Sequence, residues 1–361
     1  MTPVKFIGLT ILLALTLPSL SADSLPSKFA KRDRNKDGKL SLKEVPASFA
    51  KFKFAQADRN KDGFLDAMEL ERVAKKLAAK EDANPSEPVD PVVPKTDATR
   101  IIRDIIYRKD LKDTKGWNKL DLYLPKAKGF ATLIWIHGGG LHSGDKTKIA
   151  EVAKRFVAEG FGVASVNYRL YPKAKYPTQI KDVAKAFAWV HSNIADKGGN
   201  PNQIFIAGGS AGGHLTALLG TDDSFLKEHG LKKSAIRGAI PISGLMDVSR
   251  VGRERRKGIW GDDPKIHRAA SPLNHASKDA PPILLLHAEH DTADRRKQNQ
   301  EMYDALKKSG HPNVIIHELK NRTHNDIRPN LVGRDDPGAK LILAFLMKHS
   351  ADKASLPKTG K

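Results

Sequence analysis

Short apolar runs alternate with amphipathic helical patterns along the chain beyond residue 100. After two opening strands, each strand pattern is followed by a helix pattern, which is typical of a mostly parallel sheet flanked by helices. The sequence therefore predicts an α/β fold with a doubly wound central sheet. The expected strands span 101–107, 120–124, 132–137, 162–167, 203–207, 237–242, 283–287 and 314–318, and the expected helices span 148–159, 178–193, 211–220, 294–309 and 338–348.

A different pattern occupies the first 22 residues. Lys5 precedes an apolar run from Phe6 to Leu17, and small residues follow Pro18, which together indicate a secretory signal peptide. The apolar run is shorter than the roughly 20 residues that a membrane-spanning helix needs. We expect a secreted or periplasmic protein with no transmembrane segment after signal removal, and a retained membrane anchor is the alternative.

The stretch 80–99 carries four prolines among acidic and small polar residues. This composition favours a stiff, extended linker between two separate modules. The predicted organisation is a signal peptide at 1–22, a small module at 23–79, the linker at 80–99, the α/β domain at 100–350 and a basic tail at 351–361.

Two twelve-residue stretches in the small module, 33–44 and 58–69, match the calcium-binding EF-hand loop at every ligand position. The loop needs side-chain oxygens at alternate positions, glycine at the sixth, a main-chain carbonyl at the seventh and a bidentate Glu at the twelfth. The sequence therefore predicts two Ca²⁺ sites in a small α-helical module. The expected ligands are Asp33, Asn35, Asp37, the Lys39 carbonyl, Ser41 and Glu44 in the first loop, and Asp58, Asn60, Asp62, the Phe64 carbonyl, Asp66 and Glu69 in the second.

The eighth residues of the two loops, Leu40 and Leu65, are apolar and can pair across the loops. The spacer 45–57 contains Pro46 and is too short for two full helices. The module resembles the compact EF-hand pairs of exported bacterial proteins and, to a lesser extent, a dockerin. A structural, scaffold-binding or calcium-sensing role stays open, and a charged loop without metal is the alternative.

The stretch 203–219 has the pattern of a strand, a sharp turn and a helix around Ser210. Gly208 and Gly212 flank the serine at two residues' distance, as a nucleophile on a crowded turn requires. The amide of Ala211, at the start of the helix, would face the negative charge that develops on an attacked carbonyl. A tight turn or a phosphate-binding loop is the alternative interpretation.

A second glycine-rich turn, 137–140, follows the strand expected at 132–137. Glycines there let main-chain amides approach a ligand, so this turn can supply the other half of an oxyanion hole. His137 is interpreted as an organiser of the turn and not as a base.

A serine nucleophile needs a base, and the base needs an acid that fixes its tautomer. Asp291 follows the strand at 283–287 and His324 follows the strand at 314–318, so both are expected at the sheet edge that carries Ser210. The sequence order Ser, Asp, His is that of the α/β-hydrolases. The competing acids are Glu289, Asp294 and Asp326, and the competing bases are His290 and His317.

These motifs together resemble the α/β-hydrolase superfamily, in particular esterases similar to hormone-sensitive lipase and to acetyl-xylan and feruloyl esterases. The resemblance covers the whole α/β domain and implies that the amides of Gly139, Gly140 and Ala211 line the oxyanion hole. Leu141 and Asn325 depart from the family pattern, which affects the acyl pocket more than the reaction. The residues that carry the resemblance are 137–140, 143–146, 166–170, 208–214, 270–273, 288–291 and His324.

The chain is basic and contains no cysteine. Its 62 Lys and Arg against 41 Asp and Glu give a formal net charge of +21, which favours anionic surfaces or polymers as partners. No nucleic-acid-binding motif accompanies this charge, so no specific nucleic-acid partner is expected. The absence of cysteine excludes disulfides and thiolate chemistry. The densest basic run, 250–257, is interpreted as a solvated loop, with binding of an acidic substrate or sugar as the alternative.

The expected function is ester hydrolysis through an acyl-enzyme, with Ser210 as nucleophile, His324 as base and Asp291 as its orienting acid. No cofactor is expected in the chemistry, and Ca²⁺ is assigned to the first module. The expected substrates are small-acyl esters, including acetyl or feruloyl groups on polysaccharides. The alternatives are an amidase or peptidase on the same triad and a calcium-dependent scaffold protein whose hydrolase domain is inactive.

Overall fold

The computed structural model describes residues 99–111 and 115–350, and in the amino-terminal part residues 32–33, 35–41, 44–45, 54, 57–60 and 62–73. The expected signal peptide, the linker up to residue 98 and the basic tail lie outside the described residues. The chain divides into two compact units, Met1–Val89 and Asp90–Lys361.

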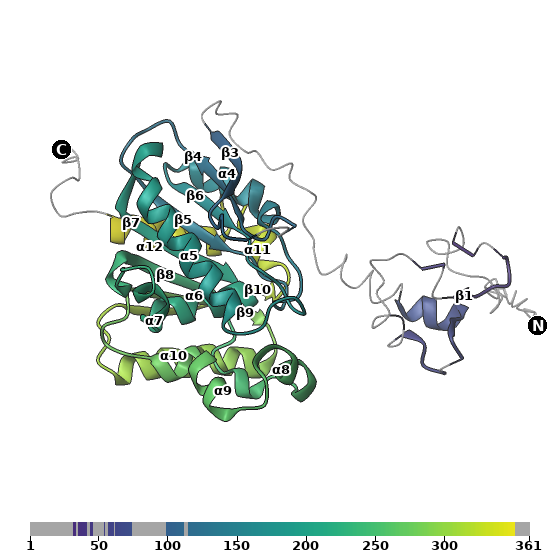
Figure 1. The fold of residues 1–361 in the computed structure, drawn as a ribbon. Coiled ribbons are helices and arrows are strands. Elements are labelled where there is room, and N and C mark those ends of the chain that lie inside the picture. Colours follow the sequence, from purple (N-terminus) through teal and green to yellow (C-terminus); the bar gives the residue numbers. More distant parts are fainter. Residues whose placement is uncertain are drawn as a thin grey trace, which may run out of the picture. The chain divides into compact units, whose positions relative to one another are not determined.

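An eight-stranded sheet forms the centre of the second unit (Figure 1). Its spatial order is β10-β9-β8-β7-β5-β6-β4-β3, and all neighbours are parallel except the pairs of β4 with β6 and β3. The predicted mostly parallel sheet is thus confirmed. The strands are β3 (Arg100–Ile106), β4 (Lys119–Leu124), β5 (Phe130–Ile136), β6 (Gly162–Val166), β7 (Gly199–Gly209), β8 (Ile236–Ile242), β9 (Ile283–His290) and β10 (Val314–Thr323).

Helices cover both faces of this sheet (Figure 1). One apolar core lies between the sheet and the side of α5, α6 and α10, and the other lies between the sheet and α4, α11 and α12. The α-helices are α4 (Ala150–Ala158), α5 (Thr178–Asn193), α6 (Ala211–Thr221), α7 (Ser224–Lys227), α8 (Arg253–Trp260), α9 (Pro264–Ala270), α10 (Ala293–Lys308), α11 (Ile327–Asn330) and α12 (Pro337–Ser350). Short 3-10 turns are η1 (Lys146–Ile149), η2 (Ala195–Lys197), η3 (Lys233–Ala235), η4 (Val248–Arg250) and η5 (Pro272–His275).

All eight expected strands and all five expected helices of this unit are present, but the segment 250–257 differs from the expectation. The sequence predicts a solvated loop there, but most of the segment forms helix α8. The helix buries only Ile259 and Trp260 at its end, so its apolar pattern is too brief to predict a helix from the sequence.

In the first unit, β1 (Leu40–Ser41) and β2 (Phe64–Leu65) form an antiparallel pair. Leu40 lies opposite Leu65, as expected, and both are fully buried with Phe54 and Leu70 in a small core. Within the described part of the chain, no helix is long and apolar enough to cross a membrane.

Candidate active site

Ser210 lies between the end of β7 and the first residue of α6. Its backbone has φ 58° and ψ −116°, a left-handed conformation that is rare for a residue with a side chain. The Ser210 amide donates to the Ile242 carbonyl at 2.8 Å, which ties the turn to the end of β8. Such strain clusters at functional sites, and here it projects the side chain from the sheet edge.

The glycines around Ser210 are required by close backbone contacts. A Cβ on Gly212 would lie 2.0 Å from the Ile136 carbonyl oxygen, and one on Gly208 would lie 2.5 Å from the same atom. Any larger residue would therefore push α6 away from the end of β5. A Cβ on Gly209, in contrast, would meet nothing within 4 Å.

The structure brings Ser210, Asp291 and His324 together. His324 Nε2 lies 2.9 Å from Ser210 Oγ, and His324 Nδ1 lies 2.8 Å from Asp291 Oδ2. Because an ionised carboxylate only accepts hydrogen bonds, Nδ1 carries the proton and Nε2 is left to accept one from the serine. The arrangement has the geometry of a nucleophile, a base and an orienting acid.

Asp291 occupies a shielded position just after β9. Burial raises the pKa of its carboxyl, but the hydrogen bond and charge of His324 and other hydrogen bonds to the carboxylate together outweigh burial, so the pKa lies below its ordinary value. The Thr292 amide also donates to Asp291 Oδ1 at 2.8 Å. The acid is therefore ionised at neutral pH and can hold His324 in one tautomer.

The rival acids have other roles. Glu289 accepts from the Asn321 amide at 2.8 Å and from Lys320, which joins β9 to β10. Asp326 accepts from the main chain and hydroxyl of Thr323 and so shapes the turn that carries His324.

The rival bases are also placed elsewhere. The His290 side chain is 60% exposed and lies 3.9 Å from Glu289, and His317 is an exposed residue on β10. In the described part of the chain neither forms a hydrogen bond with Ser210, so the base position is taken by His324.

The glycine turn after β5 packs against the serine turn. A Cβ on Gly138 would lie 2.7 Å from the Gly209 carbonyl oxygen, so only glycine allows this approach. His137 is buried and stacks on Tyr168 at 4.3 Å, while its Nδ1 donates to the Gly138 carbonyl at 2.7 Å. Burial lowers the pKa of His137, so the imidazole is neutral and serves the loop's structure.

The expected oxyanion amides are those of Gly139, Gly140 and Ala211. Gly139 and Gly140 have φ of 109° and 68°, which turns this segment back on itself. None of the three amides donates a hydrogen bond to another group in the described part of the chain. Since all three residues line cavities that also contain Ser210, their N–H groups are available to an oxyanion there.

Two cavities meet at Ser210 and His324. The larger, about 520 Å³, is lined by the glycine turn, Lys148, Asn325 and Arg328. The smaller, about 140 Å³, is lined by Leu141, Ala211, His214, Leu245 and Trp260, and by Arg255 and Arg295. The departures from the family pattern, Leu141 and Asn325, thus lie in different cavities.

Sequence reasoning missed Arg255 and Arg295 as site residues. Arg255 belongs to α8 and its Nη2 donates to the Gly140 carbonyl at 3.1 Å, whereas Arg295 belongs to the first turn of α10. The basic composition of 250–257 was the only signal for Arg255, and no motif marks Arg295.

Several positions of the motifs that carry the family resemblance are structural supports. Arg169 pairs with the buried Asp182 through two hydrogen bonds of 2.7 and 2.8 Å. Asn167 Oδ1 accepts from the Lys146 amide at 2.6 Å, and Lys146 Nζ pairs with the buried Asp121 at 2.6 Å. These contacts brace the loops after β5 and β6, close to the glycine turn.

The twelve expected calcium ligands of the first unit all lie within the described residues. Both loops close in the same way, with the sixth-position glycine amide donating to the first aspartate: Gly38 to Asp33 at 2.9 Å and Gly63 to Asp58 at 3.1 Å. Asp58 Oδ1 is buried and has no partner among the described residues, and such an oxygen suits a hard cation. However, no three acidic or histidine side chains in the described segments are close enough together to hold a metal.

Comparison with known proteins places this architecture among the esterases. Esterase LipQ of Mycobacterium tuberculosis is 32% identical over 233 residues, covering 60% of this chain and 54% of LipQ. The chain spans about half the length of the curated relatives it matches.

Two solved structures share the fold. A truncated carbohydrate esterase from gut microbiota has a TM-score of 0.61 and 22% identity, covering 71% of this chain and 98% of its own. Esterase B of Lactobacillus rhamnosis has a TM-score of 0.61 and 18% identity, covering 77% and 93%. They confirm the predicted α/β-hydrolase fold.

Family models match both units. An EF-hand model matches residues 53–74, which include the second calcium loop. The model described as BD-FAE matches residues 120–306, a stretch that contains the glycine turn, Ser210 and Asp291. Because this match covers just over half of the chain, the protein belongs to the BD-FAE family.

Proposed function

We propose that the protein is an exported serine carboxylesterase that hydrolyses small-acyl esters through an acyl-enzyme. The observation that carries the proposal is the position of His324, 2.9 Å from Ser210 Oγ and 2.8 Å from Asp291 Oδ2. The names of the relatives, esterases and a carbohydrate esterase, support an ester as the substrate bond.

In the proposed reaction, Ser210 Oγ attacks the ester carbonyl carbon while His324 Nε2 takes the hydroxyl proton. The amides of Gly139, Gly140 and Ala211 bind the oxyanion of the tetrahedral intermediate. His324 then returns the proton to the departing alcohol, which leaves an acyl group on Ser210. A water molecule, deprotonated by His324, releases the acid and restores the serine.

The proposed substrates carry short acyl groups, such as acetyl, or feruloyl groups on polysaccharides. The larger cavity combines polar side chains, including Lys148, Asn325 and Arg328, with apolar ones, so it suits both a hydroxylated alcohol and an aromatic acyl group such as feruloyl. Its apolar lining residues are Trp135, Ile149, Ile242 and Ile327. The basic character of the chain makes anionic polymers further candidate partners.

A substrate screen tests this proposal. The purified protein is assayed on 4-nitrophenyl esters of increasing chain length, acetylated and feruloylated polysaccharides, and emulsified triglyceride. We expect acetate release from soluble esters to be the fastest reaction. Faster release of long fatty acids from triglyceride would overturn the substrate assignment, and a higher rate on acetanilides than on matched phenyl acetates would favour an amidase.

Export is part of the proposal and rests on the pattern of residues 1–22. Expression with and without these residues, followed by fractionation, tests it. The full chain should be recovered outside the cytoplasm with a shortened amino terminus. Retention of an intact amino terminus in the membrane fraction would favour an anchor instead.

We further propose that the first unit binds Ca²⁺ through the two loops. The EF-hand match and the buried, unpartnered Asp58 Oδ1 support this role. Calorimetric titration with Ca²⁺ should show two sites, and Glu44→Gln and Glu69→Gln should each remove one. Unchanged binding in the double variant would place the ion elsewhere.

A further inference from the structure

The smaller cavity beside Ser210 presents an unusual set of groups. Arg255 and Arg295 reach it from two different helices, and Trp260 and Leu245 supply apolar walls. No aspartate or glutamate is among the residues that line it. We call this cavity the arginine pocket.

Two hydrogen-bond donors of residues that line the arginine pocket lack acceptors in the described part of the chain. Arg295 Nη1 and Trp260 Nε1 are buried and have no partner among the described residues. Arg255 donates only to the Gly140 carbonyl, and neither arginine forms an ion pair with a carboxylate in the described part of the chain. Buried donors without acceptors are costly, so a pocket that keeps them is suited to a ligand that supplies acceptors.

Burial also affects both cations directly. Desolvation lowers the pKa of Arg255 and of Arg295, although both guanidinium groups stay charged at neutral pH. A positive group that is partly removed from water interacts more strongly with an anion than an exposed one does. Arg295 is half-buried, whereas Arg255 is an exposed residue whose guanidinium group lies against the Gly140 carbonyl.

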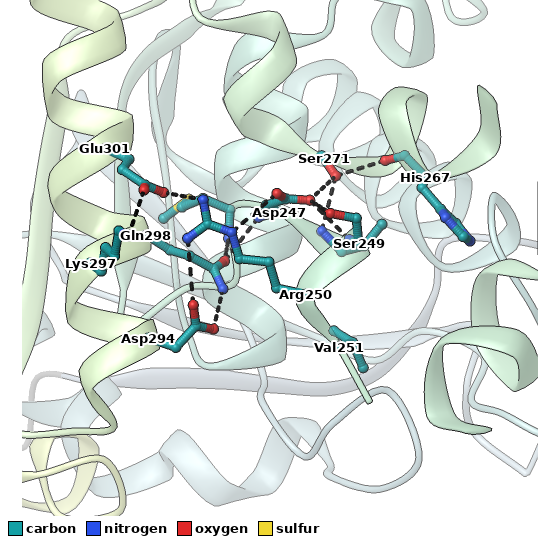
Figure 2. Close-up of polar contacts among 12 residues, drawn as sticks. Asp247, Ser249, Arg250, Val251, His267, Ser271, Asp294, Lys297, Gln298 and Glu301 are labelled. Atoms are coloured by element: carbon teal, nitrogen blue, oxygen red, sulfur yellow. Dashed lines mark hydrogen bonds and ion pairs between the residues drawn. The ribbon is translucent and has the colours of Figure 1, made fainter. Parts of the chain in front are cut away.

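Three carboxylates, one from the segment before α8 and two from α10, are engaged with a third arginine. Figure 2 shows Arg250 between Asp247, Asp294 and Glu301, with N–O distances of 3.3, 3.5 and 2.7 Å. Gln298 adds hydrogen bonds from α10 to the main chain of Met246 and Asp247 (Figure 2).

This network joins the segment before α8 to helix α10. Because α8 carries Arg255 and α10 carries Arg295, the network holds the two arginine-bearing helices in a fixed relation. The pocket is thus both positive and preorganised.

We propose that the arginine pocket binds a carboxylate group of the substrate, so that the preferred esters are those with a carboxylate on a short carbon chain beside the scissile bond. The inference rests on the esterase function proposed above and narrows its substrate class. A planar carboxylate offers several acceptor positions to arginine, and the apolar walls formed by Leu141, Leu245 and Trp260 suit its carbon stem. A volume of about 140 Å³ admits only a short stem.

Arg295 also has an alternative role as a positioning residue. Burial lowers the pKa of Arg295 and the charge of Asp291 offsets part of this lowering, so the two groups lie near enough to interact. In this role Arg295 stabilises the ionised acid of the triad. A positioning role would change the rates on all esters together, whereas carboxylate binding changes the preference between charged and neutral esters.

The test compares esters that differ only in charge. Monoethyl succinate and ethyl succinamate place the carboxylate or its neutral amide on the acyl side, and acetoxyacetate and acetoxyacetamide place them on the alcohol side. At pH 7.5 we expect the carboxylate ester of one pair to exceed its amide roughly tenfold or more in kcat/KM, mainly through a lower KM. If a pair is not turned over, its inhibition constants against 4-nitrophenyl acetate give the same ratio.

Variants assign the preference to the pocket. Arg255→Gln and Arg295→Gln should each reduce the ratio toward one, and Arg255→Lys should retain part of it because the charge remains. Arg253→Gln is the matched control, since Arg253 is an exposed residue of the same helix that does not line the pocket. Lys148→Gln, in the larger cavity, should also leave the ratio unchanged.

The outcomes separate this inference from the proposed function. A wild-type ratio near one for both pairs, or a preference that is lost with Lys148→Gln and kept in both pocket variants, would overturn the carboxylate pocket while ester hydrolysis stands. An equal fall of kcat/KM on charged and neutral esters in Arg295→Gln would show that Arg295 only positions the triad and does not bind the carboxylate. No Ser210-dependent hydrolysis of any ester would reject the proposed function itself.

Discussion

The catalytic groups of this protein come from distant parts of the chain, whereas the ligands expected in each calcium loop lie close together in the sequence. His324 meets a nucleophile 114 residues away and an acid 33 residues away. Each calcium loop carries all of its expected ligands within twelve consecutive residues. The first site therefore depends on the sheet that gathers its members, and the second depends on a local turn.

This difference determines how each site responds to change. In the α/β unit, substitutions that shift a strand end or α6 disturb the triad even when they do not touch it. In the first unit, oxygens that are expected to bind Ca²⁺ also accept hydrogen bonds from main-chain amides of their own loop. The amides of Gly38 and Gly63 donate such bonds. The predictions below separate the two kinds of site.

The largest expected effect is the loss of the nucleophile or base. Ser210→Ala and His324→Ala should each lower kcat for a short-chain aryl ester by roughly a thousandfold or more, because only binding and the oxyanion hole remain. His290→Ala and His317→Ala are the controls and should retain turnover. If His290→Ala were the inactive variant, the base assignment would be wrong.

The second-largest effect is expected when a Cβ is added to a glycine of the turn that carries Ser210. Gly212→Ala places a Cβ 2.0 Å from the Ile136 carbonyl oxygen and should cost about 3 kcal/mol of unfolding free energy or more, with loss of turnover. Gly209→Ala, whose Cβ meets nothing within 4 Å, is the matched control. Urea unfolding of both variants measures the difference, and equal stability would contradict the packing argument.

Acid should destabilise the α/β unit through buried His214. Burial lowers the pKa of His214 to about 4, although its hydrogen bond to the Leu245 carbonyl acts in the opposite direction. As the pH falls, His214 is protonated near pH 6.5 in the unfolded chain but only near pH 4 in the folded chain. The free energy of unfolding that neutral His214 contributes above pH 6.5 is therefore lost as the pH falls toward 4. The loss from this residue is about 3 kcal/mol.

Tryptophan fluorescence can follow this loss, because all four tryptophans belong to the second unit. Urea unfolding between pH 7 and pH 4 should give a clear pH slope, and His214→Asn should flatten it. Part of the slope should persist, because burial also lowers the pKa of His137. The same slope in wild type and variant would show that His214 is not the group responsible.

The smallest expected effect is that of calcium on turnover. Ca²⁺ at a hundredfold above its dissociation constant stabilises the unit that binds it by about 2.7 kcal/mol, and the ligands all lie before residue 70. Chelator should therefore leave ester turnover and tryptophan fluorescence nearly unchanged while it lowers the stability of the first unit. A large calcium dependence in the full chain, absent from a chain that begins at Thr99, would show that the units are coupled.

The sequence was sufficient where chemistry follows a local pattern or a strand end. The glycines at 208 and 212 predicted the serine turn. Positions after two strands, together with the sequence order Ser, Asp, His, favoured Asp291 and His324 over their rivals. The pairing of Leu40 with Leu65 also follows from the loop pattern. In each case the deciding information lies within a few residues of the group concerned.

The arginine pocket could not be predicted in the same way. Arg255 and Arg295 reach it only because α8 and α10 are joined through Arg250 and its three carboxylates. Two of those contacts, to Asp294 and Glu301, cross more than 40 residues and follow no periodic pattern. Helix α8 itself is almost entirely polar, so its residues resemble a solvated loop until their neighbours are known.

Mass spectrometry after reaction with a fluorophosphonate tests the central claim most directly. We predict one adduct per chain, on the peptide that contains Ser210, with loss of ester turnover in proportion to labelling and little labelling in His324→Ala. The adduct should form equally with Ca²⁺ and with chelator. Full turnover in a completely labelled sample, or an adduct on another serine, would contradict the account.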